Sequence, residues 1–256
     1  MSKLLGVLGV SFSYPGVRVL KDINLEVGAG ESHVVIGPNG AGKTTLFKVL
    51  SGETKPNEGK IYYKSNDITG LDAWQRIRLG FGRTFQVARI FSDLTVLENM
   101  VVAVECRQRI AKSQPRPWWR ASPAPETIKE AQGRLEEFRL LSKMHEEAAV
   151  LSHGDKKRLE LAVCLALEPR LLMLDEPTAG MSPEDRIGVV KLIQELQAQH
   201  ELTLLLTEHD MDVVFGLATH LTVLSQGEII ASGKPDDVRN DPLVQKVYLG
   251  QEPHYA

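Results

Sequence analysis

The chain has 256 residues, of which 43% are apolar and 25% are charged, so one large domain or two small ones with a sizeable core are expected. The formal net charge of -3 disfavours nucleic acid as the main partner, because such a partner calls for a basic face. The two cysteines lack the spacing of a metal site, and Cys164, in an apolar helical run, is expected to be a buried thiol in a reducing compartment.

No membrane-crossing segment is expected. The N-terminus lacks a long apolar stretch and a small-residue cleavage site, so it is not interpreted as a signal peptide. No part of the sequence reaches the ~18 apolar residues of a spanning helix. Any membrane process that this protein serves therefore needs another chain to cross the bilayer.

The first part of the chain is predicted to be rich in strands. Apolar side chains favour strands at 4–14 and 23–27, with the turn signal Pro15-Gly16 between them. A third apolar run, 34–36, leads into a glycine-rich loop and then a helix that ends at Gly52. A strand at 60–63, a short helix at 72–79 and an extended segment at 81–85 follow.

The glycine-rich loop matches G-x-x-x-x-G-K-[ST], the pattern of a phosphate-binding loop, between a strand and a helix as the pattern requires. Its residues are Gly37, Pro38, Asn39, Gly40, Ala41, Gly42, Lys43 and Thr44. The glycines let backbone N–H groups face phosphate oxygens, and the helix adds the positive end of its dipole. Lys43 can then reach the outer phosphates, and the Thr44 hydroxyl can ligate Mg²⁺. The loop therefore predicts a bound nucleotide.

Residues 88–168 are predicted to be mostly helical and to interrupt the strand-rich parts. A capping box at 95–98 starts one helix. Four prolines make 113–125 irregular, and apolar residues then recur at helical spacing over 128–141. Another helix is expected over 155–167.

Strands return in the last third of the chain. Their continuously apolar runs are typical of buried parallel strands and lie at 171–174, 202–206 and 221–224. Ser182-Pro183 starts a helix between the first two, and Gln226-Gly227 is a hairpin turn. This order predicts an α/β architecture in which a phosphate-loop core is split by a helical insertion.

Two acids end the predicted strand at 171–174. Asp175 and Glu176 are adjacent on an extended chain and point to opposite sides, so they should have different roles. We expect Asp175 to hold Mg²⁺ and its waters beside the phosphate loop. We expect Glu176 to face the γ-phosphate and to polarise an attacking water, a contribution of ~10²–10⁴ in rate. The alternative is a pair of acids that faces solvent.

Two further polar residues are candidates for the same site. His209 ends the next apolar strand, where it could hydrogen-bond the γ-phosphate or the attacking water. Gln86 stands where the core gives way to the helical insertion, and its amide could touch the metal or its water; a surface glutamine is the alternative. The remaining histidines are interpreted as structural and are at positions 33, 145, 153, 200, 220 and 254.

A second anion site is predicted just before the helix at 155–167. Ser152 supplies a hydroxyl, Gly154 leaves the backbone accessible, and the helix N-terminus attracts negative charge. One ATP cannot easily use two helix N-termini from distant parts of one chain. We therefore expect this segment to complete the nucleotide site of a second subunit.

These motifs resemble, in order and spacing, those of the ABC transporter ATPase subunits over nearly the whole chain. The resemblance rests on 37–45, Gln86, 151–155, 174–176 and His209. It implies a P-loop NTPase (RecA-like) core with an N-terminal antiparallel β subdomain and an inserted helical subdomain. Residues 1–256 would then be a single nucleotide-binding domain, with 1–87 and 169–256 as catalytic core and 88–168 as the helical subdomain that carries the signature motif.

The resemblance also implies an ATPase that uses ATP and Mg²⁺ in a head-to-tail dimer, with each nucleotide between one chain's phosphate loop and its partner's signature. Tyr14 resembles by position the family's adenine-stacking aromatic, although a core aromatic at a strand end is the alternative. The residues implied to bind ATP are Tyr14, Gly37, Pro38, Asn39, Gly40, Ala41, Gly42, Lys43, Thr44, Thr45, Ser152 and Gly154. Those implied to hold the metal are Thr44, Gln86 and Asp175, and those implied to act in catalysis are Glu176, His209 and Gln86.

Four segments look more narrowly like the ATPases of branched-chain amino acid importers and of related amide and urea importers: 83–86, 94–99, 179–183 and 247–250. Those systems pair two ATPases with two transmembrane permease subunits and an extracytoplasmic solute-binding protein. The resemblance implies that this chain powers such an importer from the cytoplasmic face of the cell membrane. The alternatives are a soluble ABC ATPase in an assembly role and a lipid or lipopolysaccharide exporter ATPase.

The signature segment departs from the family's common pattern. His153 replaces a glycine and Asp155 replaces a glutamine. An acid near a helix start suits the helix dipole but not a nearby phosphate, so we expect the Asp155 side chain to point away from ATP. Trp118-Trp119-Arg120 could face the membrane or a transmembrane partner, but we favour a loop that packs its own aromatics onto the insertion.

Overall fold

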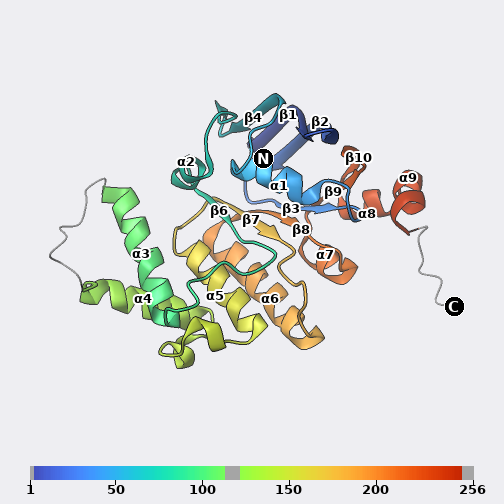
Figure 1. Ribbon diagram of the computed structural model, residues 1–256. Coiled ribbons are helices and arrows are strands. Elements are labelled where there is room, and N and C mark those ends of the chain that lie inside the picture. Colours follow the sequence, from blue (N-terminus) through green and yellow to red (C-terminus); the bar gives the residue numbers. More distant parts are fainter. Residues whose placement is uncertain (1–2, 113–121, 250–256) are drawn as a thin grey trace.

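The computed structural model describes residues 3–112 and 122–249 (Figure 1). The expectations for Trp118-Trp119-Arg120 and for Gly250 lie outside these described residues. Within them, no helix combines the length and the apolar character that crossing a membrane requires.

An antiparallel sheet forms the N-terminal part of the fold (Figure 1). Its strands, in the order β2-β1-β4-β5, are β1 (Lys3–Tyr14), β2 (Val17–Gly28), β4 (Glu58–Tyr63) and β5 (Asn66–Asp67). β1 and β2 are joined at Pro15-Gly16, where Gly16 adopts φ +80°, a conformation that glycine accepts without strain. The two strands and the turn predicted for this region are confirmed.

A second, mostly parallel sheet forms the centre of the molecule. Its strands, in the order β10-β9-β3-β8-β7-β6, are β3 (Ser32–Ile36), β6 (Phe81–Arg83), β7 (Leu171–Asp175), β8 (Thr203–Thr207), β9 (His220–Ser225) and β10 (Glu228–Gly233). β10 pairs antiparallel with β9, and the other pairs are parallel. The carboxyl ends of β3, β7 and β8 therefore meet at one edge of the sheet.

Helices lie on both faces of the central sheet and continue beyond it (Figure 1). They are α1 (Lys43–Ser51), α2 (Ala73–Arg78), α3 (Val96–Lys112), α4 (Pro125–Glu137), α5 (His153–Leu165), α6 (Pro183–His200), α7 (Met211–Leu217), α8 (Pro235–Arg239) and α9 (Pro242–Val244). Two short 3₁₀ helices, η1 (Leu141–Lys143) and η2 (Ala148–Val150), and a short π-helix, η3 (Gln245–Leu249), complete the described part.

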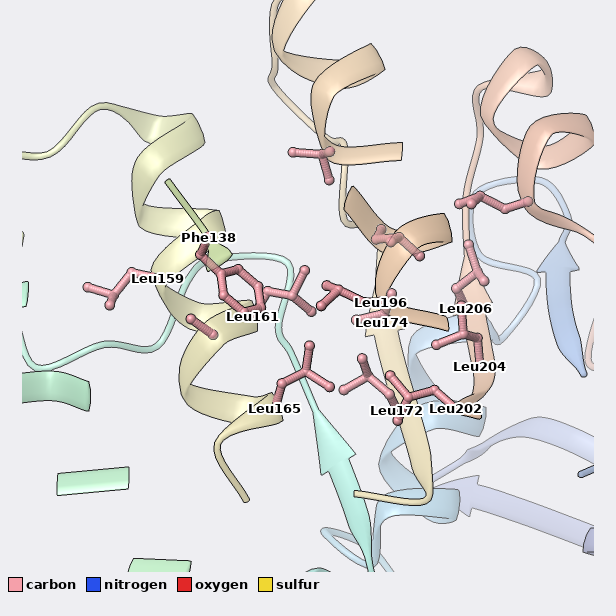
Figure 2. Close-up of a cluster of buried hydrophobic side chains, with 14 of the residues drawn as sticks. Phe138, Leu159, Leu161, Leu165, Leu172, Leu174, Leu196, Leu202, Leu204 and Leu206 are labelled. Carbon is pink, nitrogen blue, oxygen red and sulfur yellow. The ribbon is translucent and has the colours of Figure 1, made fainter. Parts of the chain in front are cut away.

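The alternation of side chains along β7 divides the interior into two cores. Leu172 and Leu174 face a cluster that includes residues of α3 to α6, and Figure 2 shows them opposite Leu161 and Leu165 of α5. Leu171 and Met173 instead belong to a cluster with α1 and the antiparallel sheet. α1 and α5 therefore lie on opposite faces of the central sheet.

The expected helices between 88 and 168 are present as α3, α4 and α5. The capping box is confirmed, since Thr95 N donates to Glu98 Oε2 (2.7 Å) and Glu98 N donates to Thr95 Oγ1 (3.2 Å). The helix predicted over 128–141 is too long, because α4 ends at Glu137 and Arg139 turns the chain at φ +58°. The buried cluster runs without interruption from these helices to the sheet, and the subdomain boundary itself remains a prediction.

Cys164 is partly exposed as a residue, but its thiol points inward. Sγ donates to the Arg83 carbonyl at 3.1 Å, and burial raises the thiol pKa to about 12. The cysteine is therefore an unreactive thiol at neutral pH, as the apolar surroundings in the sequence suggested.

Candidate functional site

The phosphate-binding loop connects β3 to α1, and its shape depends on two glycines. A Cβ at Gly37 would lie 2.1 Å from the Leu224 carbonyl oxygen, so no larger residue fits between this loop and β9. Gly42 caps α1 at φ +109°, a conformation that side chains with a Cβ rarely adopt. The loop can therefore curl over the helix N-terminus, where free backbone N–H groups attract anions.

Lys43 lies folded into this loop. Its Nζ donates to the carbonyls of Gly37 (2.7 Å) and Pro38 (3.2 Å), and the residue is 7% exposed. Burial lowers the pKa of Lys43, while the nearby carboxylates of Glu176 and Asp175 oppose that shift. The lysine, the loop and the two acids thus form one electrostatic site at the edge where β3 and β7 end.

Glu176 connects the three residues predicted to act in catalysis. Gln86 Nε2 donates to Glu176 Oε2 at 3.0 Å, and His209 Nε2 lies 2.7 Å from Glu176 Oε1. Glu176 has φ +49°, in the left-handed region that non-glycine residues seldom occupy. The turn just after β7 thus directs this carboxylate toward both partners, which come from the ends of β6 and β8.

Asp175 has different neighbours from Glu176, as its position on an extended strand predicted. Its Oδ1 accepts from Thr207 Oγ1 at 2.9 Å, and its Oδ2 lies 3.6 Å from Arg83 Nη2. Thr207 also accepts from the Glu176 backbone N–H at 3.2 Å. This fully buried threonine therefore positions both acids at once. The sequence did not predict this role, although a polar residue at the end of an apolar run could have indicated it.

The segment around Gln86 is held by the signature helix α5. Glu160 Oε1 accepts from the backbone N–H groups of Phe85 (3.1 Å) and Arg89 (3.0 Å). Lys157 Nζ donates to the Phe85 carbonyl and lies 3.6 Å from Glu160. Burial raises the pKa of Glu160, which is 2% exposed. Sequence reasoning missed this pair, because an acid and a lysine three residues apart usually form a solvated helix face.

Ser152 is the N-cap of α5 and is itself exposed. Its hydroxyl accepts from Asp155 N at 3.1 Å and donates to Asp155 Oδ2 at 2.8 Å. Lys143 Nζ donates to the same Oδ2 at 2.5 Å, and Arg158 lies 3.2 Å from Oδ1. The Asp155 side chain is thus engaged within its own helix cap and with η1, while Gly154 is buried beside Asp185.

The remaining site candidates occupy the surface around the loop. Thr44 is exposed and Thr45 is half-buried, and both lie in the first turn of α1. Tyr14 is 41% exposed at the end of β1, where its ring meets Phe12 edge-on at 4.9 Å. The part of Tyr14 in base binding remains a prediction.

The residues expected to hold Mg²⁺ fit that ion by chemistry. Thr44, Gln86 and Asp175 offer a hydroxyl, an amide and a carboxylate, and oxygen donors of these kinds are what Mg²⁺ accepts beside phosphates. Asp175 is 5% exposed, so its charge is poorly screened by water. The donor set is therefore compatible with Mg²⁺ by its chemistry.

A family model described as "ABC transporter" matches residues 20–179, more than half of the chain. The chain therefore belongs to the ABC transporter family of ATP-binding proteins. A second model, described as "Branched-chain amino acid ATP-binding cassette transporter", matches residues 228–254. Together they confirm both the ABC ATPase class and the narrower resemblance that the sequence motifs indicated.

Individual proteins agree with this assignment. The chain is 39% identical to the high-affinity branched-chain amino acid transport ATP-binding protein LivG of Escherichia coli (strain K12), over 97% of this chain and 98% of that one. It is 32% identical to the lipopolysaccharide export system ATP-binding protein LptB of Acidithiobacillus ferridurans, over 98% and 99%. The crystal structure of the ADP conformation of MJ1267, an ATP-binding cassette of an ABC transporter, superposes with a TM-score of 0.84 at 29% identity, covering 98% of this chain and all of that one.

Proposed function

We propose that this chain is the ATP-hydrolysing subunit of an ABC importer for branched-chain amino acids or related small solutes. The assignment as an ATPase rests on the contact of Glu176 with both Gln86 and His209. The phosphate loop lies beside them, and the charge of Glu176 acts on the pKa of its Lys43. The import part rests on the likeness to LivG, which exceeds the likeness to LptB at similar coverage.

In this mechanism Glu176 is the general base that takes a proton from the water attacking the γ-phosphate. His209 and Gln86 orient the carboxylate through its two oxygens. Lys43 leaves the carbonyls of Gly37 and Pro38 to donate to phosphate oxygens as nucleotide enters. Thr44, Gln86 and Asp175 would hold Mg²⁺, which would neutralise charge that develops on the phosphates.

A second subunit completes each nucleotide site. Ser152 and Gly154 begin α5, whereas the phosphate loop precedes α1 on the other face of the central sheet. A nucleotide at α1 therefore takes its second helix N-terminus from another chain, which is the same protein or a paralogue. The transmembrane permease subunits and an extracytoplasmic solute-binding protein provide the path for the solute, and they attach this chain to the cytoplasmic face of the membrane.

The test is purification of the tagged chain from detergent-solubilised membranes, followed by identification of the proteins that come with it. We expect two hydrophobic permease subunits and, in cells, uptake of labelled leucine that is lost with Glu176→Gln. Recovery without any membrane subunit would support the soluble assembly role instead. Recovery with subunits whose loss leaves leucine uptake intact but blocks lipid export would support the exporter.

A further inference from the structure

Three potential metal ligands meet at the end of the central sheet remote from the phosphate loop. They are Glu31, just before β3, His33 on β3, and His220, the first residue of β9, and their ligand atoms lie within 4.8 Å of one another. The phosphate loop follows the other end of β3, about 13 Å from His33 at the rise of an extended strand. The cluster is therefore separate from the nucleotide site.

The register of the sheet produces this meeting. His33 and His220 are direct partners on the parallel strands β3 and β9, so their side chains leave the sheet on the same face. Their rings stack with centroids 4.7 Å apart. Glu31 then places Oε1 at 2.8 Å from His33 Nδ1 and at 3.8 Å from His220 Nδ1.

The second ring nitrogen of each histidine, Nε2, is hydrogen-bonded to a hydroxyl group. His33 Nε2 lies 2.8 Å from Thr222 Oγ1, and His220 Nε2 lies 3.1 Å from Ser232 Oγ. The Glu31 carboxylate is fixed as well, because its Oε2 accepts from the Gly28 backbone N–H at 2.7 Å. Hydrogen bonds of this kind, to the nitrogen that faces away, orient the histidines of metal sites and set their tautomer.

The spacing fits one small cation. Ligands at ~2.0–2.1 Å from a tetrahedral Zn²⁺ lie about 3.4 Å apart. The distances from Glu31 Oε1 to the two Nδ1 atoms, 2.8 and 3.8 Å, bracket this value, so each of these two pairs has to move by only about half an ångström. His33 is fully buried, Glu31 is 15% exposed and His220 34% exposed, which leaves access for the ion and a water as fourth ligand.

The two imidazoles of the cluster are ligands of the kind that late first-row metals accept. A neutral imidazole presents the lone pair that a metal needs. Among the described residues this is the one group of three histidine, cysteine or acidic side chains close enough to share an ion.

We propose that Glu31, His33 and His220 form a binding site for one late first-row divalent cation, of which Zn²⁺ is the probe to use. Two imidazoles and one carboxylate suit Zn²⁺ and its neighbours, whereas Mg²⁺ and Ca²⁺ require sets of oxygen ligands. The ion ties the start of β3 to β9, and through Ser232 to β10. Its role is structural, because it lies away from the reacting phosphate.

The experiment uses the full-length chain, stripped of metal and kept free of nucleotide. Zn²⁺ at a hundredfold excess over its Kd should raise the melting temperature by roughly 5–10 °C, while Mg²⁺ and Ca²⁺ should not. Equilibrium dialysis should give one tightly bound Zn²⁺ per chain. His220→Asn should remove this binding, and Ser232→Ala should weaken it roughly 10–100-fold.

The matched control is His145→Asn, which removes an exposed histidine away from the cluster and should leave Zn²⁺ binding unchanged. Circular dichroism and ATP binding of metal-free His220→Asn check that the variant is folded. The proposal is overturned if the wild-type chain binds no Zn²⁺ tightly, or if folded His220→Asn binds it as tightly as the wild type.

Discussion

At the scale of single residues, the two adjacent acids of the site have different neighbours, so neither can take the place of the other. Asp175 is buried against Thr207 and Arg83, whereas Glu176 emerges from a left-handed turn toward Gln86 and His209. The left-handed turn carries strain, and it directs the carboxylate away from the strand toward the predicted phosphate site.

Glu176→Gln should retain ATP binding and lose most hydrolysis. The amide keeps the shape of the side chain but cannot take a proton, so kcat should fall ~10²–10⁴-fold, equivalent to about 3–5 kcal/mol. Single-turnover assays with labelled ATP measure the chemical step, and nucleotide titration measures affinity. Glu184→Gln, an exposed acid in the first turn of α6, is the matched control and should hydrolyse ATP at the wild-type rate. Normal hydrolysis by Glu176→Gln would refute the assignment of the base.

Asp155→Asn should weaken the cap of α5 and lower stability at neutral pH. Burial alone would raise the pKa of Asp155, but hydrogen bonds from Lys143 and Ser152 outweigh it and the pKa is lowered. A lowered carboxyl pKa adds stability above the unfolded-state value of about 3.9, and that stability is lost as the pH falls through the folded-state pKa. Urea titrations should show a loss of about 1–3 kcal/mol at pH 7 that vanishes in acid. An equal loss at every pH would contradict the ionic origin.

At the scale of elements, the signature helix α5 and the segment around Gln86 are joined by hydrogen bonds and are expected to move together. α5 begins at the cap that is predicted to face the partner. About one and two turns further along, Lys157 and Glu160 hydrogen-bond the backbone of Phe85 and Arg89, on both sides of Gln86. We therefore expect that a shift of α5 on binding a second subunit would move Gln86, the residue that contacts Glu176.

Glu160→Ala should release the segment around Gln86 from α5. It removes the acceptor for two backbone N–H groups and leaves the buried Lys157 without its counter-charge, a loss of about 3–5 kcal/mol in the free energy of unfolding. Glu160→Gln keeps the Oε1 acceptor and should recover most of the ATPase rate, although not the charge pair. The readouts are urea denaturation and kcat on the folded fraction. Equal kcat for the alanine and glutamine variants would show that the segment does not depend on these hydrogen bonds.

At the scale of the whole molecule, the sequence predicted contacts that arise from local rules and missed those that depend on register. The ends of neighbouring parallel strands share one edge of a sheet, so the sequence alone places Asp175, Glu176 and His209 near the loop. The meeting of His33 with His220 depends on β9 lying beside β3 in one register, which no local pattern encodes. For the same reason these two histidines were assigned only a structural role.

The location of Ser152 on the face opposite α1 leads to the sharpest test of assembly. Lys43→Ala removes the side chain expected to bind the outer phosphates. Ser152→Asp keeps a good helix cap but would place a negative charge against the phosphates bound by the partner. Each variant alone should be inactive. In an equal mixture half of the dimers are mixed, and each mixed dimer has one intact site, so the rate should recover to about a quarter of wild type if the sites act independently. Steady-state ATPase assays of the mixture, at protein concentrations that favour dimers, measure this recovery. A mixture as inactive as its parts would contradict a homodimer with shared sites that act independently.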